Sequence, residues 1–398
     1  MCFLPVIASV VQKNIGDFNV FLPDWQSVAS DPVAGPTRTD LYNPYIRFSV
    51  GGIQGAKREK IFFCPPPRYD YPRMDFLRIF STLVFGLWLV SAASAGEMTW
   101  YDSTRHRAVQ VKMYMPRQTE PAPVILFSHG LGGSIESCEY LAKAWTANGF
   151  VCVLVQHPGC DENIWKGKVR ILNEFKKAYE QNWSSRTRAK DLHAVLDRLE
   201  NLVRSDERFA SRIDMDRVGV GGIDLGALAA LLLAGQVPPD YGDSLHDPRI
   251  KAVLALSPPV LAMRNVSFRE IYQPITAPTL FVTGTEDDGV VGQTKAAHRR
   301  IPFDAMDQCQ RYLITLEGGD HRMYGGRVLS FVSSRDDEKF QSAIVRSSSY
   351  FWRAALQENP VAIRAMDRYG WQSLVGVKAS VERRGSVLIG ESTASVPH

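Results

Sequence analysis

Paired cysteines, strong charge and repeated segments are all missing from this chain of 398 residues. Its six cysteines are scattered, and no Cys-x-x-Cys spacing occurs, which excludes a zinc ribbon or a small disulfide-stapled fold. The formal net charge is only +4, so the composition gives no support to a nucleic-acid partner. The chain is 45% apolar and 22% charged, and it therefore has ample material for a large folded core.

A long membrane-spanning run is also missing near the start of the chain. The apolar run 79–90 is shorter than the about 20 residues that a spanning helix needs. It follows a short basic segment and ends near Ala93-Ser-Ala95, which matches the small-x-small rule for signal cleavage. We expect residues 74–95 to be a signal peptide, so that a protein starting near Gly96 is secreted or periplasmic. The alternative is an uncleaved anchor at 79–95, which would attach the protein to a membrane.

The residues before this signal carry many prolines and no sustained periodicity. We interpret 1–73 as a spurious or disordered extension, produced by a start assigned upstream of Met74. The basic residues in it would instead suit the cytosolic tail of a signal anchor. Residues 96–398 are expected to form a single domain, of a size that is routine for an α/β enzyme.

Strand-like and helix-like segments alternate from residue 108 onward, which is typical of a mostly parallel central sheet with helices on both faces. Strands are expected at 109–115, 123–127, 150–155, 217–221, 251–256, 279–283 and 311–316. Helices are expected at 137–147, 186–202, 225–234 and 340–356. The sequence therefore predicts the α/β class.

The most informative segment is Val218–Ala227, which reads Val-Gly-Val-Gly-Gly-Ile-Asp-Leu-Gly-Ala. It predicts a strand, a sharp turn with Asp224 at the tip, and a buried helix. The glycines at 222 and 226 are what a nucleophile elbow requires, because side chains there would collide as the chain reverses. Serine, the usual residue at such a tip, is missing. A carboxylate stands where a nucleophilic hydroxyl is expected.

Two further strands are followed by residues that carry acid–base chemistry. Asp287 comes in Gly-Thr-Glu-Asp-Asp after the strand 279–283, and His321 comes in Gly-Gly-Asp-His after the strand 311–316. Parallel strands bring their carboxyl ends to one edge of a sheet, where ligand sites form. The order of nucleophile, acid and base along the chain is that of the α/β-hydrolase fold.

A glycine-rich turn, Ser-His-Gly-Leu-Gly-Gly, follows the strand 123–127 and predicts an oxyanion hole. The backbone N–H groups of Leu131 and Leu225 are the expected donors. We count three side chains as pocket candidates: His129, His157 and Asp288. A structural role in the turn is favoured for His129, and a packed imidazole is favoured for His157.

These motifs resemble the platelet-activating-factor acetylhydrolase group of the α/β-hydrolases, a group that includes dienelactone-hydrolase-like proteins. The resemblance covers roughly residues 105–365 and is specific in the glycine-rich turn and the elbow. It implies an α/β-hydrolase fold and an esterase for short-chain acyl or lipid-like small-molecule esters, without a metal or organic cofactor. It assigns the nucleophile site, triad acid and triad base to Asp224, Asp287 and His321, and the oxyanion hole to Leu131 and Leu225.

Two positions depart from that family: Ile223 stands where it has histidine, and Asp224 stands where it has serine. An aspartate is already ionised, with an unperturbed pKa of about 4, and its attack on an acyl carbon would give a reactive anhydride. Three hypotheses stay open. The protein is a hydrolase in which His321 activates water, an Asp-nucleophile hydrolase acting on an sp³ carbon, or an inactive pseudo-hydrolase that binds a ligand or partner.

The Asp-nucleophile families, haloalkane dehalogenases and epoxide hydrolases, place a cap domain after the strand expected here at 251–256. Only residues 257–278 separate this strand from the next, so no large cap domain is expected. The segment 162–185, which contains Trp165 and Trp183, could cover the pocket instead. The sequence fixes neither the substrate nor the oligomeric state.

Overall fold

The computed structural model describes residues 94–180, 183–238, 242–261, 263–289, 294–325, 335–367 and 375–385. The expected extension at 1–73 and nearly all of the expected signal peptide at 74–95 lie outside these ranges. No helix within the described ranges has both the length and the apolar character needed to cross a bilayer.

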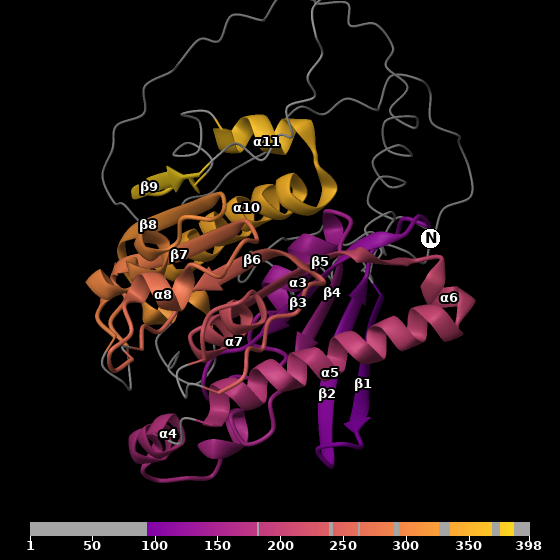
Figure 1. Ribbon diagram of the computed structural model, residues 1–398, viewed down its shortest axis with the longest axis horizontal. Helices are drawn as coiled ribbons and strands as arrows, with labels where there is room; N and C mark the ends of the chain where they lie inside the picture. The colour runs from indigo at the N-terminus through magenta and orange to yellow at the C-terminus, as the bar shows by residue number, and fades with distance from the viewer. Residues whose placement is uncertain are drawn as a thin grey trace, which may run out of the picture. The chain divides into compact units, whose positions relative to one another are not determined.

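The described part of the chain forms one nine-stranded sheet in the order β1-β2-β4-β3-β5-β6-β7-β8-β9 (Figure 1). The strands from β4 through β3 to β8 run parallel, whereas β1, β2 and β9 pair antiparallel with their neighbours. The strands are β1 (Ser94–Asp102), β2 (Arg107–Met115), β3 (Ala122–Ser128), β4 (Val151–Val155), β5 (Ile213–Ile223), β6 (Ile250–Leu256), β7 (Thr279–Glu286), β8 (Arg311–Asp320) and β9 (Ala379–Arg384).

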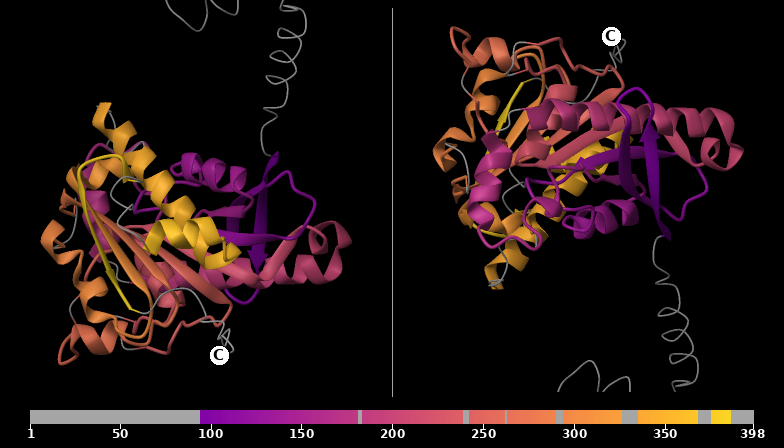
Figure 2. Two further views of the ribbon diagram at one scale, coloured as in Figure 1. Left: turned by 90° about the horizontal axis from the view of Figure 1, so that it is seen from above. Right: turned by 90° about the horizontal axis from the view of Figure 1, so that it is seen from below.

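Helices lie on both faces of this sheet (Figure 2). Those described are α3 (Glu139–Ala147), α4 (Ile171–Glu180), α5 (Trp183–Ser205), α6 (Glu207–Ala210), α7 (Leu225–Leu233), α8 (Phe268–Tyr272), α9 (Ile301–Ala305), α10 (Arg335–Gln357) and α11 (Pro360–Asp367). The structure thus confirms the predicted α/β class with a mostly parallel sheet. Between β6 and β7 the described residues form only the short helix α8.

The central strands are apolar on both sides because each face of the sheet is covered. In β3, Val124 and Leu126 pack into the core under α5 and α7, whereas Ile125 and Phe127 pack into the core with α3 and α10. This alternation follows from the two-residue period of a strand. Every residue of α7 is buried, as its nearly all-apolar sequence predicts. The two cores hold the carboxyl ends of β3, β5, β7 and β8 at one edge.

The predicted strands and helices are all present, with boundaries that differ by a few residues. The largest shift of a start is at α10, which begins at Arg335 rather than Phe340, and β5 begins at Ile213 rather than Arg217. β1, β9 and several short helices were not predicted from the sequence. β1 begins at Ser94, and its register with β2 includes the pair Gly96↔Met113. A chain that starts at Gly96 would therefore keep most of this strand.

Candidate active site

The turn between β5 and α7 is a strained strand-to-helix elbow with Asp224 at its tip. The backbone of Asp224 has φ 51° and ψ −120°, a conformation that few non-glycine residues adopt. A Cβ on Gly222 would lie 2.3 Å from the backbone of Gly226, and a Cβ on Gly226 would lie 2.1 Å from Ser128 O. Both positions therefore require glycine. The strand, turn and helix predicted for this segment are confirmed.

Asp287, just past β7, is fully buried and surrounded by hydrogen-bond donors. Its Oδ2 accepts hydrogen bonds from Thr283 Oγ1 at 3.1 Å and from Tyr324 Oη at 2.9 Å. Its Oδ1 accepts one from Ser257 Oγ at 2.9 Å, and the buried guanidinium of Arg299 lies 3.3 Å away. Burial and the nearby Asp287 charge raise the pKa of Tyr324 well above 10.0, so its hydroxyl stays a donor. These partners hold the carboxylate in one orientation.

His321, at the carboxyl end of β8, contacts Asp287 through Nδ1, at 2.9 Å from Oδ1. Ser257 Oγ lies 2.9 Å from the same nitrogen. Burial by itself lowers the pKa of His321, but the hydrogen bond to Asp287 and the negative charges of Asp224 and Asp287 outweigh burial and raise it. The imidazole is thus held by its Nδ1 edge, and its charged form is favoured by carboxylates on both sides.

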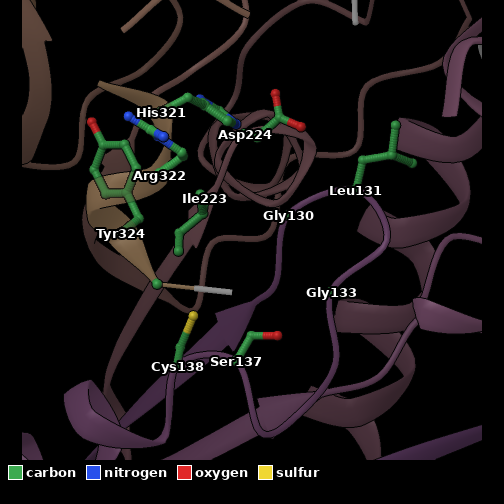
Figure 3. Close-up of a pocket in the computed structure, with 11 residues that line it drawn as sticks. Gly130, Leu131, Gly133, Ser137, Cys138, Ile223, Asp224, His321, Arg322 and Tyr324 are labelled. Carbon is green, nitrogen blue, oxygen red and sulfur yellow. The ribbon is translucent and has the colours of Figure 1, made fainter. Parts of the chain in front are cut away.

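A small cavity joins the elbow to this histidine. It has a volume of about 90 Å³, and Asp224 and His321 both line it. Figure 3 shows the Asp224 carboxylate and the His321 ring at the same end, with Leu131 on the turn opposite. No hydrogen bond to the Asp224 carboxylate comes from a described residue, so this group is open to the cavity. The other lining residues are Gly130, Gly133, Ser137, Cys138, Ile223, Arg322, Tyr324 and Gly325.

The turn after β3 supplies the other side of the cavity. Gly130 and Leu131 line it, and a Cβ on Gly130 would lie 3.7 Å from the Cβ of Asp224. The second expected donor, the amide of Leu225, is the first of α7 and so has no acceptor within the helix. Of the two predicted oxyanion-hole residues, Leu131 lines the cavity, whereas Leu225 follows the tip residue in the chain and is not among the lining residues.

The first two pocket candidates lie behind the turn instead of lining the cavity. His129 Nδ1 lies 2.7 Å from Gly130 O, and its Nε2 accepts the backbone N–H of His157 at 3.2 Å. Burial and the positive charge of Arg188 lower the pKa of His129 well below 6.5. His157 is fully buried, as the packed reading predicts, and Asp191 Oδ2 lies 3.0 Å from its Nδ1. The ring nitrogens of both histidines therefore have hydrogen-bond partners inside the protein.

The third pocket candidate, Asp288, points to solvent. Its side chain is 53% exposed and pairs with Lys295 at 2.8 Å. The cavity lining does not include it, because the chain leaves the sheet edge directly after Asp287.

The segment after β4 packs over the glycine-rich turn. Trp165 Nε1 donates to Gly132 O at 2.7 Å, and Phe175 of α4 lies so close that a Cβ on Gly132 would be 2.4 Å from its ring. Asp224 and Arg299 also act electrostatically on Tyr179 of α4, whose pKa is raised mainly by burial. The expected cover at 162–185 is therefore partly helical, and burial keeps the hydroxyl of its Tyr179 protonated.

Three polar residues around the Asp287–His321 pair were not predicted from the sequence. Ser257 is the residue after β6 and has φ 51°, and its only sequence signal is a polar side chain at a strand end. Arg299 donates to Asp287 O at 2.6 Å and to Ser257 O at 2.7 Å, yet it belongs to no motif. Tyr324 lies in the short 3₁₀ helix that begins at His321. Only the fold brings these three together.

The described residues hold no group of three or more His, Cys, Asp or Glu side chains placed to bind a metal ion. Comparison of the chain with protein-family models and with curated proteins finds no match.

Proposed function

We propose that this protein is a hydrolase with the α/β-hydrolase fold that cleaves small carboxylic esters with a water molecule activated by His321. The observation that carries the proposal is the strained elbow, whose tip faces the same cavity as an Asp287–His321 pair. Non-glycine residues in such conformations cluster at functional sites, because the strain persists only where the surrounding structure enforces it. The resemblance to the platelet-activating-factor acetylhydrolase group supports the same substrate class.

The order of the site residues along the sheet supports the proposal of an α/β-hydrolase fold. The elbow follows β5, the acid follows β7, the base follows β8, and the glycine-rich turn follows β3. A strand–turn–helix elbow, an oxyanion loop after the third strand and the chain order nucleophile, acid, histidine are the features that define this fold.

The chemistry follows from the two edges of the imidazole. Nδ1 of His321 contacts Asp287 and Ser257, which leaves Nε2 as the base. Nε2 takes a proton from water as the water oxygen bonds to the acyl carbon, and the carbonyl oxygen becomes an oxyanion beside the amides of Leu131 and Leu225. Collapse breaks the acyl–alkoxy bond, and the leaving alkoxide takes the proton from Nε2. An acid and an alcohol result, and His321 is again neutral.

Asp224 fits this scheme as an acceptor for the second hydrogen of the water. Its carboxylate accepts no hydrogen bond from the described residues and opens to the cavity. Its charge also helps to raise the pKa of His321, so the neutral base forms at a higher pH than in an unperturbed histidine. We therefore expect ester hydrolysis to increase towards alkaline pH.

The cavity favours small substrates. A volume of about 90 Å³ is below the roughly 300–1,000 Å³ of pockets that enclose drug-sized ligands. It suits a short acyl group, with the remainder of the ester outside.

A second candidate is an Asp-nucleophile hydrolase, and the free Asp224 carboxylate favours it. In that reaction the carboxylate displaces a leaving group from an sp³ carbon, and His321-activated water then cleaves the covalent ester. The two mechanisms differ in where an oxygen from water first appears.

The test is turnover of a chromogenic acetate ester by the full chain, with His321→Gln, Asp224→Ser and, as a matched carboxylate control, the exposed Asp288→Asn. Wild-type hydrolysis that is lost in His321→Gln and kept in Asp288→Asn supports the proposal. Hydrolysis by Asp224→Ser alone overturns it and favours a binding protein with an inactivated site. A single turnover of an alkyl acetate, whose alkoxy carbon is sp³, in H₂¹⁸O separates the mechanisms: label in the product acid indicates direct water attack, and label in the Asp224 peptide with an unlabelled acid indicates the nucleophile.

We also propose that residues 74–95 direct export, so that the protein is secreted or periplasmic. Terminal sequencing of the native protein should then begin near Gly96. Peptides from 1–73 would contradict both the export and the upstream-start interpretation.

A further inference from the structure

We propose that Arg188 of α5 is a positioning residue that aims and polarises the Leu131 amide from behind the glycine-rich turn. The inference rests on the proposed function for the meaning of that amide as an oxyanion donor. The geometry of Arg188 is independent of it.

Arg188 is a fully buried cation whose guanidinium contacts oxygens of the turn region. Its Nη1 donates to His129 O at 2.6 Å, and its Nη2 donates to Gly130 O at 3.2 Å and to Cys160 O at 3.1 Å. Ser128 Oγ lies 3.4 Å from Nη1. Within the described ranges no carboxylate forms an ion pair with it, and its buried Nε has no hydrogen-bond partner. Burying a charge without a counter-charge is costly, so this placement calls for a compensating role.

The carboxylate nearest along α5 is committed elsewhere. Asp191 pairs with Arg105 and Arg107, both at 2.8 Å, and it contacts His157. Burial lowers the pKa of His157 to about 4, so this ring is neutral. A neutral ring that contacts Asp191 through Nδ1 accepts from Ser128 Oγ through Nε2, at 2.8 Å. Asp191 therefore does not neutralise Arg188, and the charge of Arg188 acts on the carbonyl groups of the glycine-rich turn.

The peptide between Gly130 and Leu131 links this cation to the cavity. Its carbonyl is held on the inner side by Arg188, by the His129 ring at 2.7 Å and by the Gly133 N–H at 3.1 Å. The described peptide bonds are all trans, so the N–H of Leu131 is directed opposite to that carbonyl. Leu131 lines the cavity, so we take its N–H to point into it.

The contacts of Arg188 with the turn favour an oxyanion in the cavity in two ways. Hydrogen bonds from a cation to a carbonyl withdraw electron density from its amide, which makes the Leu131 N–H a stronger donor. The donor direction is also fixed before substrate arrives, so little reorganisation is needed as the oxyanion forms.

Isotope labelling can isolate this one peptide bond. The dipeptide Gly-Leu occurs only at 86–87 and 130–131 in the chain. Full-length protein with carbonyl-¹³C glycine and ¹⁵N leucine therefore gives two correlated signals, and a Leu131→Val variant assigns them. Arg188→Met should move the Gly130 carbonyl to lower frequency and shift the Leu131 amide, and Arg188→Lys should give a smaller displacement. The matched control is Arg212→Met, since Arg212 donates to Pro116 O at 2.6 Å in another part of the fold.

An unchanged Gly130–Leu131 signal in Arg188→Met overturns the inference, whether or not the protein has activity. If Arg188→Met does not fold, Arg188→Lys decides, because a lysine keeps the charge but lacks the fork that reaches two carbonyls.

The functional arm uses the ester assay in the Asp224→Ser background. Arg188→Met should lower kcat by about tenfold or more with little change in KM, since single oxyanion donors are worth about 10²–10³ in kcat. Partial recovery in Arg188→Lys supports polarisation. A rise in KM with kcat unchanged contradicts it. If no variant hydrolyses any ester, the proposed function fails, while the labelled signal still decides the inference.

Discussion

Among the histidine–aspartate pairs in the described part of the chain, two have similar geometry and opposite character. His157 lies 3.0 Å from Asp191, and His321 lies 2.9 Å from Asp287. Each ring also has a serine hydroxyl within hydrogen-bond distance. The His157 cluster is sealed in the interior, whereas His321 opens to the cavity at the elbow.

The two rings differ in charge state for a physical reason. Burial dominates at His157 and lowers its pKa to about 4. At His321 the hydrogen bond to Asp287, together with the charges of Asp224 and Asp287, raises the pKa in spite of burial. A Ser–His–Asp set therefore does not by itself define an active site. Access and the surrounding charges decide whether a ring organises a turn or exchanges protons.

The largest expected contrast comes from removing each ring. His321→Gln should reduce ester hydrolysis by about 10²–10⁴, the usual contribution of a general base. Its effect on stability should be small, because the ring lies at the edge of a cavity. His157→Gln should instead lower the free energy of unfolding by about 1–3 kcal/mol, the cost of leaving buried partners without hydrogen bonds.

Urea unfolding and initial rates on the same two variants measure both effects. Equal loss of activity at full stability in His157→Gln would contradict the assignment of this ring to a structural role.

The pH dependence of stability should have opposite signs at the two rings. Between about pH 6.5 and 4, unfolded His157 binds a proton that the folded ring does not, so stability is lost as pH falls. The effect amounts to about 3 kcal/mol. The raised pKa of His321 gives stability that is present below the unfolded pKa and lost as pH rises through the folded pKa.

Unfolding at pH 5 and pH 7 should therefore show a smaller pH effect in His157→Gln than in wild type, and a larger one in His321→Gln. The same slope in all three proteins would show that neither ring has a shifted pKa.

Asp224→Asn separates the charge of the tip residue from its shape. Losing the carboxylate charge should lower the pKa of His321, because this charge is one of the causes that raise it. The rising limb of any pH–rate profile should move to lower pH, and titration of the ring by NMR should show the same displacement. Asp288→Asn is the control, and a matching displacement in it would mean that general electrostatics are responsible.

Much of the sheet and the elbow followed from the sequence because local pattern determines them. Buried parallel strands read as apolar runs, and the glycines at 222 and 226 mark the close approach that the elbow needs. Asp287 and His321 could be found because each directly follows such a strand. Their contact follows from the parallel order of β7 and β8.

The remaining parts depend on contacts between distant segments. Arg188 lies in α5 and Arg299 lies in the turn before α9, and neither belongs to a motif. Only the fold places their guanidinium groups on backbone carbonyls near the site. The edge strand β9 pairs with β8 from far along the chain, and its partly exposed sequence lacks an apolar run. A packed role was favoured for His157, but its partner Asp191 could not be predicted, because this residue comes from the middle of α5.

The smallest expected effect compares the serines of the two clusters. Ser257→Ala removes a donor from Asp287, which still accepts from Thr283 and Tyr324, so a loss of about 0.5–1.5 kcal/mol is expected. Ser128→Ala removes the group that hydrogen-bonds His157 Nε2 and leaves this buried nitrogen without a donor, which should cost about 1–3 kcal/mol. Chemical unfolding at pH 7 measures both. A larger loss in Ser257→Ala would mean that the open cluster, not the sealed one, depends on its serine for structure, and the distinction drawn between them would have to be reversed.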